Sequence, residues 1–237
     1  MRLDKYLSNS LAVSRAQINV FIKKNEVCVN GVRVNKKDFK INEDKDIISV
    51  NGEKIEYKEF VYYMLNKPGG YVSAVKDNFD KTVVELIDTK YDIFPIGRLD
   101  KDTEGLLLLT NNGSLAHHLT NPNHHVSKKY FVEIDFEMSD SEMEEFQNGI
   151  EIKDGDNELF ITKKCLIEKI SPVTYNVTIE EGKFHQVKRM FGYFNKNVIY
   201  LKRLSMGIIE LDKNLKLGEY RELSNDEIIK LKENSGF

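Results

Sequence analysis

Residues 97–113 place a carboxylate, Asp100, two positions after a fixed cation, Arg98, and shortly before an unbroken run of leucines at residues 106–109. A continuous apolar run this short is typical of a buried strand. Such a strand would anchor the preceding loop rigidly, and the neighbouring guanidinium would favour the ionised carboxylate. A reactive carboxylate needs this arrangement, so Asp100 is the first candidate for chemistry.

Two other interpretations fit the same spacing. Asp100, Asp102 and Glu104, followed by Gly105, match the opening of an EF-hand calcium loop. That loop needs a bidentate glutamate at its twelfth position, where this chain has Asn111, and it also needs flanking helices. An ordinary acidic loop without any chemistry satisfies the spacing as well, so spacing alone does not decide.

Three further motifs occur in a fixed order around this stretch. Residues 66–71 read Asn-Lys-Pro-Gly-Gly-Tyr, residues 128–130 read Lys-Lys-Tyr, and residues 181–190 read Glu-Gly-Lys-Phe-His-Gln-Val-Lys-Arg-Met. Together with residues 97–113, they resemble the RsuA-type family of ribosomal RNA pseudouridine synthases over essentially the whole chain. The resemblance implies an isomerase that flips a uridine out of structured RNA into a pocket.

The resemblance also implies roles for individual residues. Asp100 matches the catalytic aspartate, Tyr130 the tyrosine that stacks on the uracil, and Lys188 the basic residue that pairs with the catalytic carboxylate. Many relatives outside this branch have arginine at the last of these positions, and lysine keeps the charge but loses the bidentate fork. Arg98 and Arg189 are expected to contact the RNA.

The implied reaction needs neither a metal ion nor a nucleotide cofactor, so we expect none. The segment at residues 122–130 looks more like enzymes that modify 16S RNA of the small subunit than like those for 23S RNA, which stays the alternative. A catalytically silent RNA-binding factor for ribosome assembly is another alternative, and the intact set of Asp100, Tyr130 and Lys188 argues against it.

The first 58 residues predict a separate basic module. They carry a net charge of +4, and the remainder carries about −7, within a chain of 237 residues and net charge −3. A capping box at residues 14–17 and a hairpin around Asn30 and Gly31 accompany two short helices. This pattern resembles an S4-type RNA-binding domain, in which basic side chains grip phosphates. The candidates are Arg2, Arg15, Lys23, Lys24, Lys36 and Lys37.

The expected fold class is α+β, with two domains. Residues 1–58 form the small α/β S4-like domain, and residues 59–237 form a catalytic domain whose central sheet is mixed, mainly antiparallel and flanked by helices. Within the helix that follows Gly182, an apolar stripe should face the core. Its members are Val187, Met190, Phe191 and Phe194.

The remaining sequence features are consistent with a cytoplasmic monomer that acts on ribosomal RNA, within an assembling small subunit. No apolar stretch approaches the roughly 18–20 residues of a membrane helix, and the N-terminus has no signal-peptide core. Cys28 and Cys165 lie in apolar surroundings that predict buried thiols. Four histidines at residues 117–118 and 124–125 come as adjacent pairs, whose side chains point apart, which disfavours a metal site.

Overall fold

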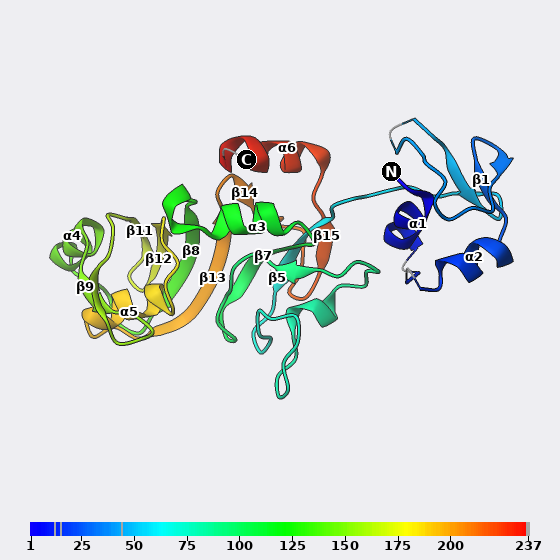
Figure 1. Cartoon of the computed structure of the whole chain (residues 1–237). Helices are drawn as coiled ribbons and strands as arrows, with labels where there is room; N and C mark the ends of the chain where they lie inside the picture. Colours follow the sequence, from blue (N-terminus) through cyan, green and yellow to red (C-terminus); the bar gives the residue numbers. More distant parts are fainter. Residues whose placement is uncertain (12, 15, 44, 236–237) are drawn as a thin grey trace. The chain divides into compact units, whose positions relative to one another are not determined.

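The computed structural model describes residues 1–11, 13–14, 16–43 and 45–235 and contains two compact units (Figure 1). One unit comprises Met1–Val61 and Asp88–Asp92, and the other comprises Tyr62–Ile87 and Ile93–Phe237. These units are defined by packing. The limits of the functional domains, residues 1–58 and 59–237, stay a prediction.

The first unit packs two helices, α1 (Leu3–Leu11) and α2 (Ile18–Lys24), against a four-stranded sheet. At the predicted hairpin, Asn30 and Gly31 have φ values of 52° and 79°, which fits the left-handed backbone that a type I′ turn requires. The hairpin prediction is therefore confirmed. The strand order is β2 (Val32–Arg33), β1 (Val27–Val29), β3 (Ile48–Val50) and β4 (Glu53–Lys54).

The start of α2 differs from the prediction. Gln17 occupies the N-cap and makes no side-chain capping bond. The Ser14 hydroxyl donates instead to Gln17 Oε1 at 2.8 Å, and the Ser14 carbonyl accepts the Gln17 N–H at 2.9 Å. The predicted capping box is wrong because the Ser14 and Gln17 side chains bond to each other, and neither caps a backbone N–H group.

The second unit is built on a nine-stranded sheet. Within the described residues, β7 (Glu104–Thr110) and β13 (Val198–Met206) run parallel and the other paired strands run antiparallel, so the predicted mixed, mainly antiparallel sheet is confirmed. Three short strands, β6 (Phe94–Pro95), β9 (Glu151–Lys153) and β15 (Tyr220–Glu222), carry no periodic pattern in the sequence that would predict them. The order is β11 (Leu166–Ser171), β12 (Thr174–Ile179), β8 (Lys128–Ile134), β13 (Val198–Met206), β7 (Glu104–Thr110), β5 (Tyr62–Lys67) and β15 (Tyr220–Glu222). In addition, β14 (Ile209–Glu210) pairs with β13 and β6 (Phe94–Pro95) with β7, while β9 (Glu151–Lys153) and β10 (Leu159–Ile161) form a separate pair.

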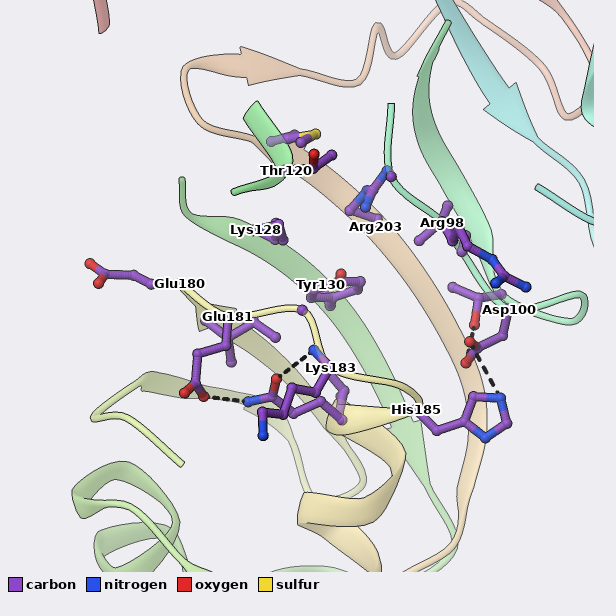
Figure 2. A pocket seen from close by; sticks show the side chains of 18 of the residues that line it. Arg98, Asp100, Thr120, Lys128, Tyr130, Glu180, Glu181, Lys183, His185 and Arg203 are labelled. Carbon is purple, nitrogen blue, oxygen red and sulfur yellow. Dashed lines mark hydrogen bonds and ion pairs between the residues drawn. The ribbon is translucent and has the colours of Figure 1, made fainter. Parts of the chain in front are cut away.

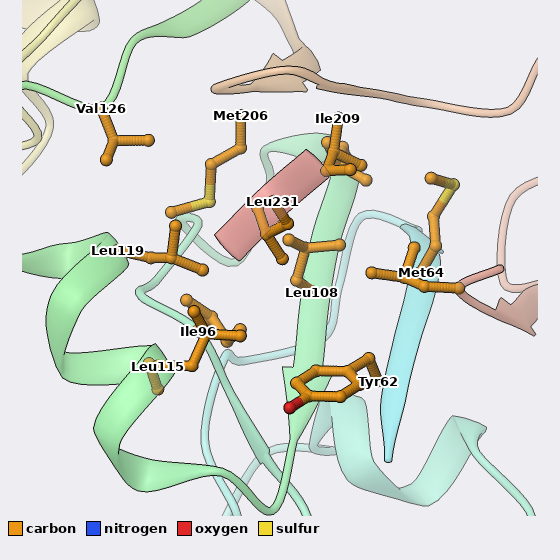
Figure 3. Close-up of a cluster of buried hydrophobic side chains, with 13 residues drawn as sticks. Tyr62, Met64, Ile96, Leu108, Leu115, Leu119, Val126, Met206, Ile209 and Leu231 are labelled. Atoms are coloured by element: carbon orange, nitrogen blue, oxygen red, sulfur yellow. The ribbon is translucent and has the colours of Figure 1, made fainter. Parts of the chain in front are cut away.

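The leucine run forms a buried strand, as predicted. All of residues 106–109 are buried in β7. Because side chains alternate along a strand, Leu106 and Leu108 share one face, where α3 (Gly113–Thr120) and α6 (Asn225–Ser235) contribute to the core (Figure 3). The loop that carries Asp100 therefore enters one of the most deeply buried strands of the molecule.

Helix α5 (Gln186–Tyr193) is anchored by the predicted apolar stripe. Val187, Met190, Phe191 and Phe194 are all buried. The ring of Phe191 lies 4.9 Å from that of Phe146, on α4 (Asp140–Asn148). This packing fixes the rotation of α5 and so determines where its polar side chains point.

The structure describes both cysteines and the paired histidines. Cys28 and Cys165 are half-buried, so the prediction of buried thiols is wrong in degree, although burial raises the pKa of Cys165 to about 12. The rings of His118 and His124 lie 3.7 Å apart. The described residues contain no cluster of three side chains that could hold a metal ion, and none of their helices is long and apolar enough to cross a membrane.

An acid-sensitive ion pair connects β15 to α6. Arg221 donates to both carboxylate oxygens of Glu227 at 2.8 Å and to Asp212 at 2.8 Å, and Arg221 lowers the pKa of Glu227 to about 2. Since this pKa is lower in the folded chain, the stabilisation is present above the ordinary glutamate pKa and is lost as pH falls from about 4.5 to 2.

We therefore expect Glu227→Gln to lower the free energy of unfolding by up to about 3 kcal/mol at pH 7 and by progressively less below pH 4.5. The measurement is urea denaturation followed by circular dichroism at several pH values. Glu233→Gln, at an exposed position of the same helix, is the control. A difference between wild type and Glu227→Gln that does not change with pH would contradict the assignment.

Candidate active site

A cavity of about 250 Å³ opens in the second unit where β8, β12 and β13 meet the loop before β7 and the segment that leads into α5 (Figure 2). Three predicted site residues line it, namely Asp100, Tyr130 and Arg98. The cavity therefore brings together residues from three of the four sequence motifs, since His185 of the last motif lines it too.

Asp100 is half-buried in the loop before β7 and faces two basic side chains from the last motif. His185 Nε2 lies 3.4 Å from Asp100 Oδ1, and Lys188 Nζ lies 3.4 Å from Oδ2. The Thr103 hydroxyl donates to Oδ2 at 3.5 Å. The structure thus places Lys188 beside Asp100, as the resemblance implied, and it adds His185 to the same carboxylate.

Lys188 has a second and shorter contact. Its Nζ lies 2.6 Å and 2.8 Å from the two carboxylate oxygens of Asp102, and this hydrogen bond holds the pKa of Asp102 below its usual range. The family resemblance implies no role for Asp102. The i, i+2 spacing of two aspartates in a loop was the available signal, because such residues can share one cation.

Arg98 does not have the predicted relation to Asp100. It is exposed at the cavity, and it forms no ion pair with Asp100, although the structure describes both side chains. The residue between them, Leu99, is buried, and the Ser73 hydroxyl bonds both its N–H and its carbonyl, at 3.0 and 2.9 Å. This clamp fixes the backbone with Arg98 on the rim, so Lys188 and His185 take the place predicted for Arg98.

A buried lysine binds the backbone of the same loop. Lys67, in the first motif, has no exposed surface, and its Nζ donates to the carbonyls of Pro68, Lys101 and Thr103 at 3.0, 3.1 and 2.8 Å. Burial lowers the pKa of Lys67 to about 8. The residue types of this motif predict no role for Lys67. In the structure, this lysine joins the backbone on both sides of Asp102.

The last motif positions its basic residues through a strained turn. His185 has φ 52° and ψ 27°, a left-handed conformation that is uncommon outside glycine, and its ring stacks on Phe184 at 3.7 Å. Gln186 closes the turn, since its Nε2 donates to Glu181 at 2.6 Å and its Oε1 accepts the Lys183 N–H at 3.1 Å. Non-glycine residues in this region cluster at functional sites, which fits the contact with Asp100.

The wall of the cavity opposite this turn comes from β8 and β13. Tyr130 is 7 % exposed and pairs across the strands with Arg203, which is 2 % exposed. On the other side of β13, Arg203 pairs with Gly105. Gly105 has φ +98°, and a Cβ there would lie 2.2 Å from the Arg203 carbonyl oxygen. Glycine is therefore required for β7 and β13 to approach so closely.

We expect Gly105→Ala to lower the free energy of unfolding by about 2–4 kcal/mol, because it combines a backbone clash with a disfavoured φ. Urea denaturation followed by circular dichroism measures the change. Gly113→Ala is the control, since a Cβ at Gly113 meets no atom within 4 Å, and it should change the stability by less than about 0.5 kcal/mol. Equal stability of the two variants would show that β7 shifts freely.

The predicted RNA-binding residues differ in how much of their charge is engaged. Arg189 donates to the Lys153 carbonyl at 2.7 Å and lies over the Phe184 ring at 5.4 Å. Arg2 pairs with Asp4 at 2.7 Å. Their RNA contacts stay predictions, as do those of the other basic candidates. Of these, Lys23, Lys24 and Lys36 are exposed, Lys37 is half-buried, and Arg15 lies outside the described residues.

Comparison with known proteins identifies the family. Residues 61–193 match the RNA pseudouridylate synthase family, and residues 1–48 match the S4 domain. The chain belongs to the RNA pseudouridylate synthase family. Family membership confirms the predicted enzyme class, an isomerase that converts uridine to pseudouridine in RNA, and the S4 match confirms the predicted type of N-terminal domain.

Full-length relatives of this family have the same extent as the chain. It is 40 % identical to the uncharacterized RNA pseudouridine synthase YtzG of Bacillus subtilis (strain 168), covering 98 % of this chain and 99 % of the relative. It is 38 % identical to ribosomal small subunit pseudouridine synthase A of Escherichia coli (strain K12), covering 96 % and 98 %. A crystal structure of a pseudouridylate synthase matches with a TM-score of 0.69 at 35 % identity, over 98 % of this chain and 99 % of that one.

Proposed function

We propose that this protein isomerises a uridine of 16S ribosomal RNA, in the small subunit, with Asp100 as the essential carboxylate. The observation that carries the proposal is the cavity lined by Asp100, His185 and Tyr130, together with the contact of Lys188 with Asp100. The full-length similarity to a relative named for the small ribosomal subunit supports the choice of RNA. We place the reaction in the cytoplasm, on an assembling subunit, with the enzyme acting as a monomer.

The geometry suits the steps of this reaction. The bond between ribose and uracil nitrogen breaks, the base turns, and the ribose rejoins the base through a carbon atom, so no atom is gained and none is oxidised. A flipped base needs an aromatic surface, which Tyr130 provides in this proposal. Asp100 either attacks the nucleotide or promotes cleavage of the glycosidic bond, and Lys188 holds its carboxylate in place.

Mapping of pseudouridine in ribosomal RNA tests the proposal. RNA from cells with and without the gene is treated with a carbodiimide that marks pseudouridine, and both ribosomal RNAs are read by reverse transcription. We expect one 16S position to lose its signal in the deletion strain and to regain it when the gene is restored. A position lost from 23S RNA instead would support the alternative substrate, and unchanged maps would refute the proposed function.

The basic side chains of the first unit should control how RNA affinity depends on salt. Each phosphate contact releases counterions, so replacing Lys23 and Lys24 by glutamine should reduce the slope of log affinity against log salt by roughly 1–2. Binding of a 16S fragment is measured by filter retention at several salt concentrations. The control exchanges Lys45 and Lys54, two exposed lysines of the same unit outside the predicted set. Equal slopes for the two double variants would show that residues 23 and 24 are merely solvated.

A further inference from the structure

Two cations in the cavity have no counter-ion. Arg203 is 2 % exposed, its Nε donates to the Leu106 carbonyl at 2.8 Å, and its Nη2 has no hydrogen-bond partner among the described residues. Lys128 is half-buried and donates to the Val126 carbonyl at 2.7 Å. Neither cation forms an ion pair within the described parts of the chain. A buried guanidinium with an unpaired nitrogen is costly, and it indicates a site that is completed by a ligand.

The nearby carboxylates are engaged elsewhere. Glu181 accepts from Gln186 at 2.6 Å, and Glu180 lies 3.4 Å from a nitrogen of His125. Asp100 faces Lys188 and His185 on the other side of the cavity. Burial and the charge of Arg203 lower the pKa of Lys128 to about 8, which shows how poorly the two cations are compensated. The ligand that completes the pair must therefore bring hydrogen-bond acceptors of its own.

The position of the pair identifies those acceptors. Arg203 lies directly across the strands from Tyr130, and Lys128 lies two residues before Tyr130 on the same face of β8 (Figure 2). In such positions, the Arg203 and Lys128 side chains each begin roughly 5–7 Å from that of Tyr130, about the span of one pyrimidine ring. A base stacked on Tyr130 would present an edge to both donors. Uracil carries two carbonyl oxygens, which are acceptors of the required kind.

We propose that Arg203 and Lys128 donate hydrogen bonds to a carbonyl oxygen of the flipped uracil and so position the base above Tyr130. This inference rests on the proposed function, because it presupposes a uridine in the cavity. It assigns to Arg203 and Lys128 the recognition of the base, whereas Asp100, at the opposite side, acts on the glycosidic bond. Gly105 takes part indirectly, since it lets β7 approach the backbone of Arg203.

The test changes the carbonyl oxygens of the target base and, separately, the two cationic side chains of the protein. A 16S fragment carrying the mapped target is prepared with uridine, 2-thiouridine or 4-thiouridine at that position, since sulfur is a weak acceptor. Single-turnover rates are measured for wild type, Lys128→Met and Arg203→Lys. Lys129→Met is the matched control, because Lys129 neighbours Lys128 but pairs with Glu168 at 3.1 Å and does not line the cavity. Thermal melting shows which variants fold as wild type does.

We expect one thio base to slow the wild type and Lys129→Met by roughly 10-fold or more, the effect of losing a hydrogen bond from a charged donor. In Lys128→Met or Arg203→Lys, the rate on ordinary uridine should fall, and the thio penalty should shrink to less than about twofold. Sensitivity to 4-thiouridine would also make the pair a selector against cytidine, which carries an amino donor at that position.

Two results would overturn the inference. One is a thio penalty of equal size in wild type and in both site variants. The other is a thio penalty that the variants lose only on RNA in which a neutral methylphosphonate replaces a phosphate beside the target. That result would mean that the two cations bind the RNA backbone and not the base. Failure of the proposed function looks different, since wild type would then leave ordinary uridine RNA unmodified.

Discussion

Asp100→Asn should abolish pseudouridine formation while leaving the fold and the RNA affinity unchanged. Asparagine has nearly the same shape as aspartate, but it has no charge and cannot act as a nucleophile or base. Asp100 lines the cavity and lies 3.4 Å from both Lys188 and His185. Loss of such a group typically costs at least about 10³-fold in rate.

The measurement is tritium release from RNA whose uridine carries the label at carbon 5, since that hydrogen leaves when the carbon joins the ribose. Asp102→Asn is the control for a general effect of charge in this loop. The Asp102 side chain is 75 % exposed and contacts Lys188. Loss of its charge should slow the reaction by only about 10-fold, because Lys188 is then held less firmly. Substantial release by Asp100→Asn, or an equal loss in both variants, would remove Asp100 from its proposed role.

Much of the fold could be predicted because local patterns and tertiary structure agree. The leucine run, the Asn30–Gly31 hairpin and the stripe of α5 each have the periodicity or turn chemistry of the element that forms. The short strands β6, β9 and β15 have two or three residues each and are created by pairing with longer partners. So few residues carry no periodic signal, and only the finished sheet defines them.

The contact of Lys188 with Asp100 could be predicted from the family resemblance, whereas the other contacts of this loop could not. Sequence neighbours led us to place Arg98 beside Asp100, whereas the backbone clamp at Leu99 leaves Arg98 exposed and the partner comes from residue 188. The role of Lys67 was equally invisible, because its three acceptors are backbone carbonyls, which every residue possesses. Contacts made through the backbone leave no signature in the residue types.

Lys188 is the second residue whose replacement should have a large effect. Its Nζ lies 2.6 Å from Asp102 and 3.4 Å from Asp100, so one ammonium group connects two carboxylates across 86 and 88 positions of sequence. Lys188→Met keeps an unbranched side chain that is one atom shorter and removes the charge. Two neighbouring carboxylates without a shared cation repel each other, and Asp100 loses its orientation.

We expect Lys188→Met to lower the single-turnover rate by roughly 10²-fold or more, measured with saturating enzyme so that RNA binding does not contribute. Lys188→Arg should keep much more activity, because the charge is restored although the geometry of the guanidinium differs. The rate alone does not separate loss of the cation from a local distortion of the loop, so a second measurement is needed.

The pKa of Asp102 provides that measurement. The hydrogen bond from Lys188 holds this pKa below its usual range, so it should rise toward the ordinary aspartate value in Lys188→Met and stay low in Lys188→Arg. Carboxyl carbon NMR of labelled aspartate follows the titration in the folded protein without RNA. If the Met variant is slow and the pKa of Asp102 has not moved, Lys188 does not hold the two carboxylates. Since His185 also faces Asp100, it would then be the stronger candidate for the side chain that orients this carboxylate.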